Sequence, residues 1–192
     1  LDRTRRLREQ ARRETPLVFR RNQESYQNAA DAISAALTQQ DLQPVRSRVD
    51  DEQLLKKASE LLPRLAPKGS AIIEAVNQLA DKPVIRTTGW EQEPWQKHKP
   101  GVVLLEQGKE RELEPADTVP LQPEDRQFRA FFADALQDLK KESRSAVLRL
   151  LSAVLEPTLI LDREATHNRA AKAAAAPDPV KVRLPRGPLI LP

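Results

Sequence analysis

Apolar side chains recur at intervals of three and four residues along much of this chain, the spacing of helices with one buried face. Three such stripes stand in residues 22–81. They consist of Tyr26, Ala29, Ala30, Ile33, Ala36 and Leu37; Leu54, Leu55, Ala58, Leu61, Leu62 and Leu65; and Ile72, Ile73, Val76 and Leu79. Asn22, Asp50 and Ser70 are placed to cap the three helices, and Pro63 to kink or end the second. Residues 22–81 therefore predict a helical cluster, with a linker at 41–48.

A fourth stripe is the longest, and it predicts one helix in residues 122–155 that Pro123 opens and Pro157 ends. Its apolar positions are Phe128, Phe131, Phe132, Leu136, Leu139, Ala146, Val147, Leu150, Val154 and Leu155. We interpret its three phenylalanines as core rather than as a binding surface.

Strand-like stretches are short and scattered, at residues 17–19, 83–88, 101–106, 158–161 and 180–184. The best β-hairpin is central: strand 101–106 meets the turn Gln107-Gly108, and residues 109–113 alternate as a returning strand. We therefore assign residues 83–119 to a β-hairpin region.

The two ends of the chain are alike in plan. Each has an aspartate placed as a cap, a basic or Ala-rich helix (residues 2–14 and 162–176), then proline and a strand. We treat residues 1–21 and 156–192 as two similar helix–strand modules. The whole pattern predicts one α+β domain over residues 1–192, predominantly helical, with short strands from both termini and a central β-hairpin.

Charge is divided unevenly along the chain: +5 in residues 1–21, −4 in 22–161 and +3 in 162–192. Basic ends around an acidic body suit termini that lie near an anionic surface such as lipid headgroups, although simply solvated ends are the alternative. A nucleic-acid binder more often carries a basic stripe across its fold, so no nucleic-acid partner is expected. The chain has no methionine and no apolar run near the ~20 residues that cross a bilayer, so we expect a piece of a longer protein.

Candidate chemistry is sparse. The absence of cysteine excludes disulfides, thiolate metal sites and cysteine nucleophiles. The two histidines, His98 in a basic loop and His167 in the last helix, fall short of the three ligands usual in a catalytic metal site. No catalytic or phosphate-binding motif is present. We therefore predict no catalytic residue, no metal site and no cofactor, and expect that this fragment is not itself an enzyme.

Trp90 and Trp95 stand five residues apart in a loop rich in charge and proline. As an exposed aromatic platform they are the candidate ligand-binding residues, for a peptide, a glycan or a small ligand. The alternative is that they plug the joint between the helical cluster and the hairpin.

Three segments resemble the extracellular domain of the seven-transmembrane HD phosphohydrolase family. The segment Leu155-Glu156-Pro157-Thr158-Leu159-Ile160-Leu161-Asp162-Arg163-Glu164-Ala165-Thr166 is similar to that family's C-terminal signature, except that Thr158 stands where Asn is commoner. Residues 1–19 resemble its start and 102–118 its middle hairpin, whereas the loop of Trp90 and Trp95 matches no family pattern.

The resemblance implies an extracytoplasmic domain, periplasmic or extracellular, at the inner membrane of a bacterium. It would stand between a first transmembrane helix and a seven-helix bundle, and a cytoplasmic HD domain would hydrolyse a cyclic dinucleotide, cyclic di-AMP. The catalytic His and Asp of that HD domain have no counterpart in this chain.

On these grounds we expect a sensory domain whose two termini emerge on the same side and point at the membrane. An unknown extracytoplasmic ligand or protein would be its partner, and a homodimer is possible. Two alternatives stay open: a basic helical nucleic-acid- or ribosome-associated protein, and a structural or dimerisation spacer without a ligand.

Overall fold

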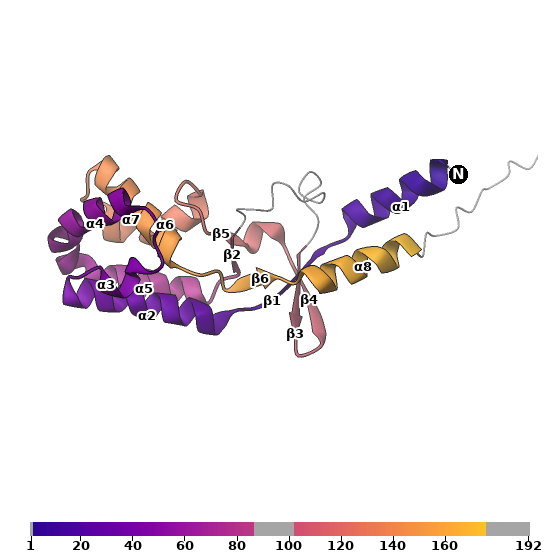
Figure 1. Cartoon of the computed structure of the whole chain (residues 1–192), viewed down its shortest axis with the longest axis horizontal. Helices are drawn as coiled ribbons and strands as arrows, with labels where there is room; N and C mark the ends of the chain where they lie inside the picture. The colour runs from indigo at the N-terminus through magenta and orange to yellow at the C-terminus, as the bar shows by residue number, and fades with distance from the viewer. Residues whose placement is uncertain (1, 87–101, 176–192) are drawn as a thin grey trace, which may run out of the picture.

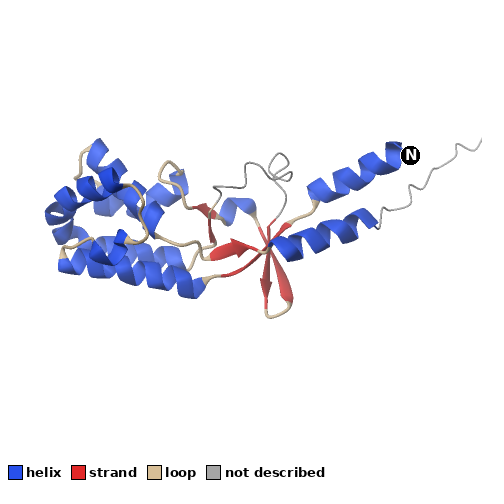
Figure 2. Cartoon of the chain, viewed as in Figure 1, coloured by secondary structure: helices blue, strands red, loops and turns tan. Residues whose placement is uncertain are grey.

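The chain is elongated, with helices at both ends and a sheet between them. A computed structural model describes residues 2–86 and 102–175. Helices α2 to α7 form one end, which we call the helical body; α1 and α8 form the other end, which we call the helix pair (Figures 1 and 2). The mixed α+β fold class predicted from the sequence is confirmed.

The helices of the described residues are α1 (Asp2–Glu14), α2 (Gln23–Gln39), α3 (Gln43–Arg46), α4 (Glu52–Leu65), α5 (Gly69–Ala80), α6 (Arg126–Leu136), α7 (Lys141–Val154) and α8 (Arg163–Ala175). The strands are β1 (Leu17–Arg21), β2 (Val84–Ile85), β3 (Val102–Glu106), β4 (Lys109–Leu113), β5 (Val119–Pro120) and β6 (Leu159–Leu161). Short 3-10 turns stand at Ala66–Lys68 and Pro115–Asp117.

The main sheet has the strand order β4-β3-β1-β6. Strand β1 is parallel to β3, with Leu17 opposite Val102, and antiparallel to β6, with Phe19 opposite Leu161. The predicted hairpin is confirmed as β3 and β4. Its turn residues Gln107 and Gly108 have φ of 50° and 76°, the left-handed pair that suits the twist of a two-residue hairpin. A second, two-stranded sheet joins β2 and β5 in parallel.

The apolar stripes predicted for residues 22–81 build the core of the helical body. On α4 the buried residues are those of the predicted stripe: Leu54, Leu55, Ala58, Leu61, Leu62 and Leu65. Phe128 and Phe132 are fully buried in the same core, and Phe131 packs against it half-buried. The interpretation of the three phenylalanines as core is therefore confirmed.

The prediction of a single long helix in residues 122–155 was wrong. The chain folds there into α6 and α7, which pack against different helices. Helix α6 packs on α5 and α7 on α4. A straight helix of that length would extend about 50 Å and could not pack against both α5 and α4. The Arg144 guanidinium ends α6, since its Nη2 donates to the carbonyl oxygens of Gln137 and Leu139 at 2.9 and 3.2 Å.

Several local predictions were also wrong. Asp51, not Asp50, caps α4 and accepts from the Leu54 N–H, while Ser70 lies inside α5 rather than at its cap. Asn22 occupies the cap position of α2 but its side chain does not cap that helix. Pro63 stands inside α4, which continues to Leu65, and the expected linker 41–48 contains α3. The predicted cap of α8 is confirmed, because Asp162 accepts from the Ala165 N–H.

Tyr26 is a fully buried polar residue of the helical body. Its hydroxyl donates to the carbonyl oxygen of Val76 at 2.6 Å, which ties α2 to α5. Burial raises the pKa of Tyr26 well above the ordinary value for tyrosine, because the phenolate would be desolvated.

Because the pKa of Tyr26 is raised, the free energy of unfolding depends on pH in the alkaline range. Above about pH 10 the unfolded chain releases the Tyr26 proton and the folded chain keeps it, so stability falls with rising pH by up to about 1.4 kcal/mol per pH unit. We expect Tyr26→Phe to lack this pH-dependent component, and to be less stable by about 1 kcal/mol near neutrality because it loses the bond to Val76. Urea unfolding at a series of pH values measures it, and equal alkaline slopes in the two proteins would contradict the prediction. Tyr26 is the one tyrosine of the chain, so tyrosinate absorbance follows it directly.

Candidate functional site: the joint between helical body and helix pair

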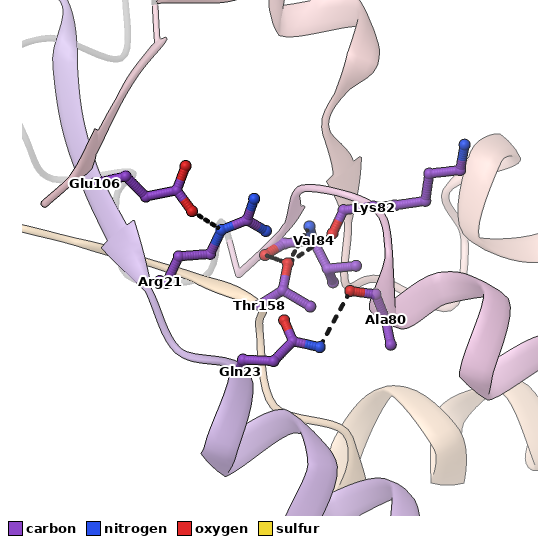
Figure 3. Close-up of polar contacts among 7 residues, drawn as sticks. All are labelled: Arg21, Gln23, Ala80, Lys82, Val84, Glu106 and Thr158. Atoms are coloured by element: carbon purple, nitrogen blue, oxygen red, sulfur yellow. Dashed lines mark hydrogen bonds and ion pairs between the residues drawn. The ribbon is translucent and has the colours of Figure 1, made fainter. Parts of the chain in front are cut away.

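Three chain segments meet where the helical body joins the sheet, and we call residues 21–23, 80–86 and 152–158 the joint. Thr158 lies at its centre with its side chain fully buried (Figure 3). Its Oγ1 accepts from the Val84 N–H at 2.8 Å and donates to the Lys82 carbonyl oxygen at 2.7 Å. One hydroxyl thereby fixes the start of β2 against the start of β6.

Asn22 and Arg86 extend this bonding to α2 and α7. The Asn22 side-chain amide donates to the Pro157 carbonyl oxygen at 3.0 Å. The Asn22 backbone N–H donates to the Thr158 carbonyl oxygen at 2.8 Å. The Arg86 guanidinium donates to the carbonyl oxygen of Leu155 at 2.7 Å, at the carboxyl end of α7, where a cation also meets the favourable end of the helix dipole. The end of α7 and the start of α2 are therefore bonded to the same few residues.

The outer contacts of the joint are more exposed. Gln23 donates to the Ala80 carbonyl oxygen at 3.4 Å, and Arg21 pairs with Glu106 of β3 at 2.7 Å, with both side chains more than 40% exposed (Figure 3). Solvent screens such a pair, so it orients the strands more than it stabilises them.

A second set of bonds connects the sheet to the helix pair. Thr166 of α8 is buried, and its Oγ1 accepts from the Val18 N–H of β1 at 3.0 Å. The Val18 carbonyl oxygen accepts from the Asp162 N–H at 2.8 Å, and Arg169 of α8 pairs with Glu110 of β4 at 2.6 Å. Helix α8 is thus anchored on the strand that α1 leads into.

The helix pair carries both ends of the described chain to the same side of the molecule. Helices α1 and α8 lie side by side, so the start of α1 and the end of α8 are at the same pole, far from the helical body (Figure 1). The expectation that both termini emerge on one side is confirmed for the described residues. In the same residues no helix is long and apolar enough to span a membrane.

The candidate ligand residues Trp90 and Trp95 lie outside the described residues, as does His98. The segment that contains them follows Arg86 of the joint and precedes β3. His167 is exposed on α8, and the described part of the chain contains no group of three side chains that could hold a metal ion.

Sequence reasoning missed most of the joint. Thr158 was noted only as a departure from a family pattern, and Arg86 and Thr166 were not singled out. The available signal was weak: Thr158 is a polar residue between Pro157 and the apolar run Leu159 to Leu161. Its partners are backbone groups more than 70 residues away, and sequence pattern does not identify those.

The first and last helices of this α+β domain pair at one pole. A domain with this arrangement can be joined to neighbouring segments at both of its ends on the same side. The family model described as 7TM-HD extracellular matches residues 1–191. The chain therefore belongs to this family, 7TMR-HDED, and is the extracellular sensory domain of a 7TM-HD protein. Neither the curated proteins nor the solved structures contain a match.

Proposed function

We propose that this domain regulates a cytoplasmic HD domain of the same protein, and that the HD domain hydrolyses a cyclic dinucleotide, cyclic di-AMP. The membership in the 7TM-HD extracellular family supports the proposal. The structural observation that carries it is a set of hydrogen bonds. Arg86 binds the carbonyl oxygen at the end of α7, Thr158 before β6 binds Lys82 and Val84, and β1 binds Thr166 of α8. A change in the helical body reaches the helix pair through these bonds.

In this proposal the domain has two packings of similar free energy, and an extracytoplasmic ligand or protein binds one of them better. Such differential affinity is what lets a bound molecule shift a distant equilibrium. The helix pair would pass the shift to the flanking membrane segments, and its basic residues would lie near lipid headgroups. The domain itself supplies no catalytic group, cofactor or metal, and nucleic acid is not a partner.

The spacer hypothesis differs in needing no ligand. One observation favours it: the apolar cavity inside the helical body holds only about 30 Å³, little more than the space of one water molecule. Ile33, Leu65 and Val147 are among the residues that line it. A small apolar effector therefore has no preformed room there.

The test uses the full-length parent protein in proteoliposomes. We expect hydrolysis of cyclic di-AMP at a kcat/KM at least tenfold above that for cyclic di-GMP, and a changed rate when the extracellular domain is deleted. No hydrolysis of either dinucleotide would contradict the enzymatic part. Hydrolysis at the same rate with and without the domain would reject regulation and favour the spacer.

A further inference from the structure

A groove of about 370 Å³ lies between α6 and α7, on the helical body and away from the helix pair. Its volume falls within the range of about 300–1,000 Å³ that is usual for small-molecule sites. Three arginines line it, Arg126 and Arg129 from α6 and Arg144 from α7. Glu124 is the single carboxylate among its lining residues, so the groove has an excess of positive charge.

The arginines of this groove differ from those of two other surface grooves because they lack carboxylate partners. In a groove between α4 and α7, Arg149 pairs with Asp51 at 3.3 Å. In another, beside α3, Arg46 pairs with Glu52 at 3.2 Å. Within the part of the chain that the structure describes, the guanidinium groups of Arg126 and Arg129 make no ion pair or hydrogen bond.

The Arg144 side chain is held in place by the protein. Its Nη2 donates to two carbonyl oxygens at the end of α6, and its Nε is buried without a hydrogen-bond partner among the described residues. A guanidinium fixed in this way loses little conformational freedom when an anion binds. Because Nη2 already donates to the protein and Nε is buried, Nη1 is the nitrogen that would donate to the anion.

One wall of the groove is apolar. The apolar surface open to solvent comes from Ala130 and Ala133 of α6, which are exposed beside the two arginines, while Phe132, Leu136 and Leu148 are buried beneath them. Arg126, Arg129 and Ala133 are spaced by three and four residues, so they share one face of α6. An inorganic anion would use the cations alone, whereas an organic acid would use both the cations and the apolar wall.

We propose that this groove binds a small organic acid, in which a carboxylate is joined to a short apolar group. The carboxylate lies between Arg126, Arg129 and Arg144, and the apolar group lies against Ala130 and Ala133. Such a ligand bridges α6, which follows β5, and α7, whose carboxyl end is held by Arg86 of the joint. The proposal supplies a ligand class for the sensory role, but binding to the chain does not depend on which dinucleotide the parent protein hydrolyses.

Titration calorimetry of the 192-residue chain tests the proposal with four probes: hexanoate, acetate, hexylamine and inorganic phosphate. Hexanoate is expected to bind at least fivefold more tightly than acetate or phosphate, and more weakly as salt is added. Hexylamine, which has the same tail and the opposite charge, is not expected to bind. Equal affinity for hexylamine, or tighter binding of phosphate than of hexanoate, would overturn the assignment.

Two variants locate the site. Arg126→Gln and Arg129→Gln are each expected to weaken hexanoate binding roughly tenfold, the loss of one charge-assisted hydrogen bond. Both residues are exposed, so circular dichroism and the thermal midpoint are expected to be unchanged. Arg111→Gln removes an exposed arginine of β4 as the matched control and is expected to bind hexanoate as the wild type does. An equal loss in the control, or no loss in either groove variant, would overturn the proposal. Such a failure leaves cyclic di-AMP hydrolysis by the parent protein to its own test.

Discussion

Thr158→Val is expected to lower the free energy of unfolding by about 1–3 kcal/mol. Valine matches threonine in shape, but it removes the hydroxyl that accepts from the Val84 N–H and donates to the Lys82 carbonyl oxygen. The Val84 N–H also donates to the Lys82 carbonyl oxygen at 2.9 Å, so each backbone group keeps one partner while it loses its bond to a fully buried hydroxyl. Urea unfolding followed by circular dichroism measures the change.

Two further variants separate the hydroxyl from the packing. Thr158→Ser keeps the hydroxyl and loses one methyl group, so we expect a cost of about 1 kcal/mol. Thr38→Val makes the same substitution at an exposed position of α2 and is expected to change stability by less than about 0.5 kcal/mol. A serine variant as unstable as the valine variant would show that the bonds of Thr158 contribute little.

Phe128→Ala is expected to cost about 3–5 kcal/mol, the usual range for truncating a buried phenylalanine. Phe128 is fully buried, and its ring packs against that of Phe132 with centroids 5.2 Å apart and planes inclined by 60°. Such tilted pairs add to the effect of burial alone.

Phe131→Ala is the matched comparison on the same helix. Phe131 is half-buried and only packs against the edge of the core, so we expect a cost of about 1–2 kcal/mol. Thermal or urea unfolding of the two variants checks the difference. Equal costs would mean that α6 does not present Phe128 to the core as the structure has it.

The elements predicted with most success were those whose signal is local. The leucine stripe of α4 predicted every buried residue of that helix, because a helix with one buried face must repeat its apolar positions at helical spacing. The hairpin of β3 and β4 followed from Gln107 and Gly108 between two strand-like runs.

The failures have a common cause in tertiary structure. Leu139 continues the apolar spacing past the end of α6, and the polar run of residues 140–145 was the one local sign of a break. The break depends on Arg144 reaching back to the carbonyl oxygens of Gln137 and Leu139, and on α5 and α4 drawing the two helices apart. Asp50 and Asp51 are equivalent as caps by sequence, and the packing of α4 selects Asp51.

The candidate site was predicted least well, for the same reason. The joint is made of single polar residues that bond backbone groups far away in sequence, and backbone groups have no sequence signature. The arginine groove combines Arg126 and Arg129 with Arg144 across the break that the sequence analysis missed. Only the paired ends of the chain were anticipated, from the similar plan of the two terminal modules and from the resemblance to the family.

The position of β1 restricts the kind of motion that the sheet can transmit. Because β1 is paired on both sides, with β3 and with β6, α8 can slide along it only if the β6 register changes. A shift of one residue would turn every side chain of β6 to the opposite face, and a shift of two would displace α8 by about 7 Å. Sliding is therefore blocked, and the sheet acts as a stiff coupling. What remains is rotation of α1 and α8 together as one lever, whose small angular change at the sheet becomes a larger sideways displacement at the far ends of the two helices.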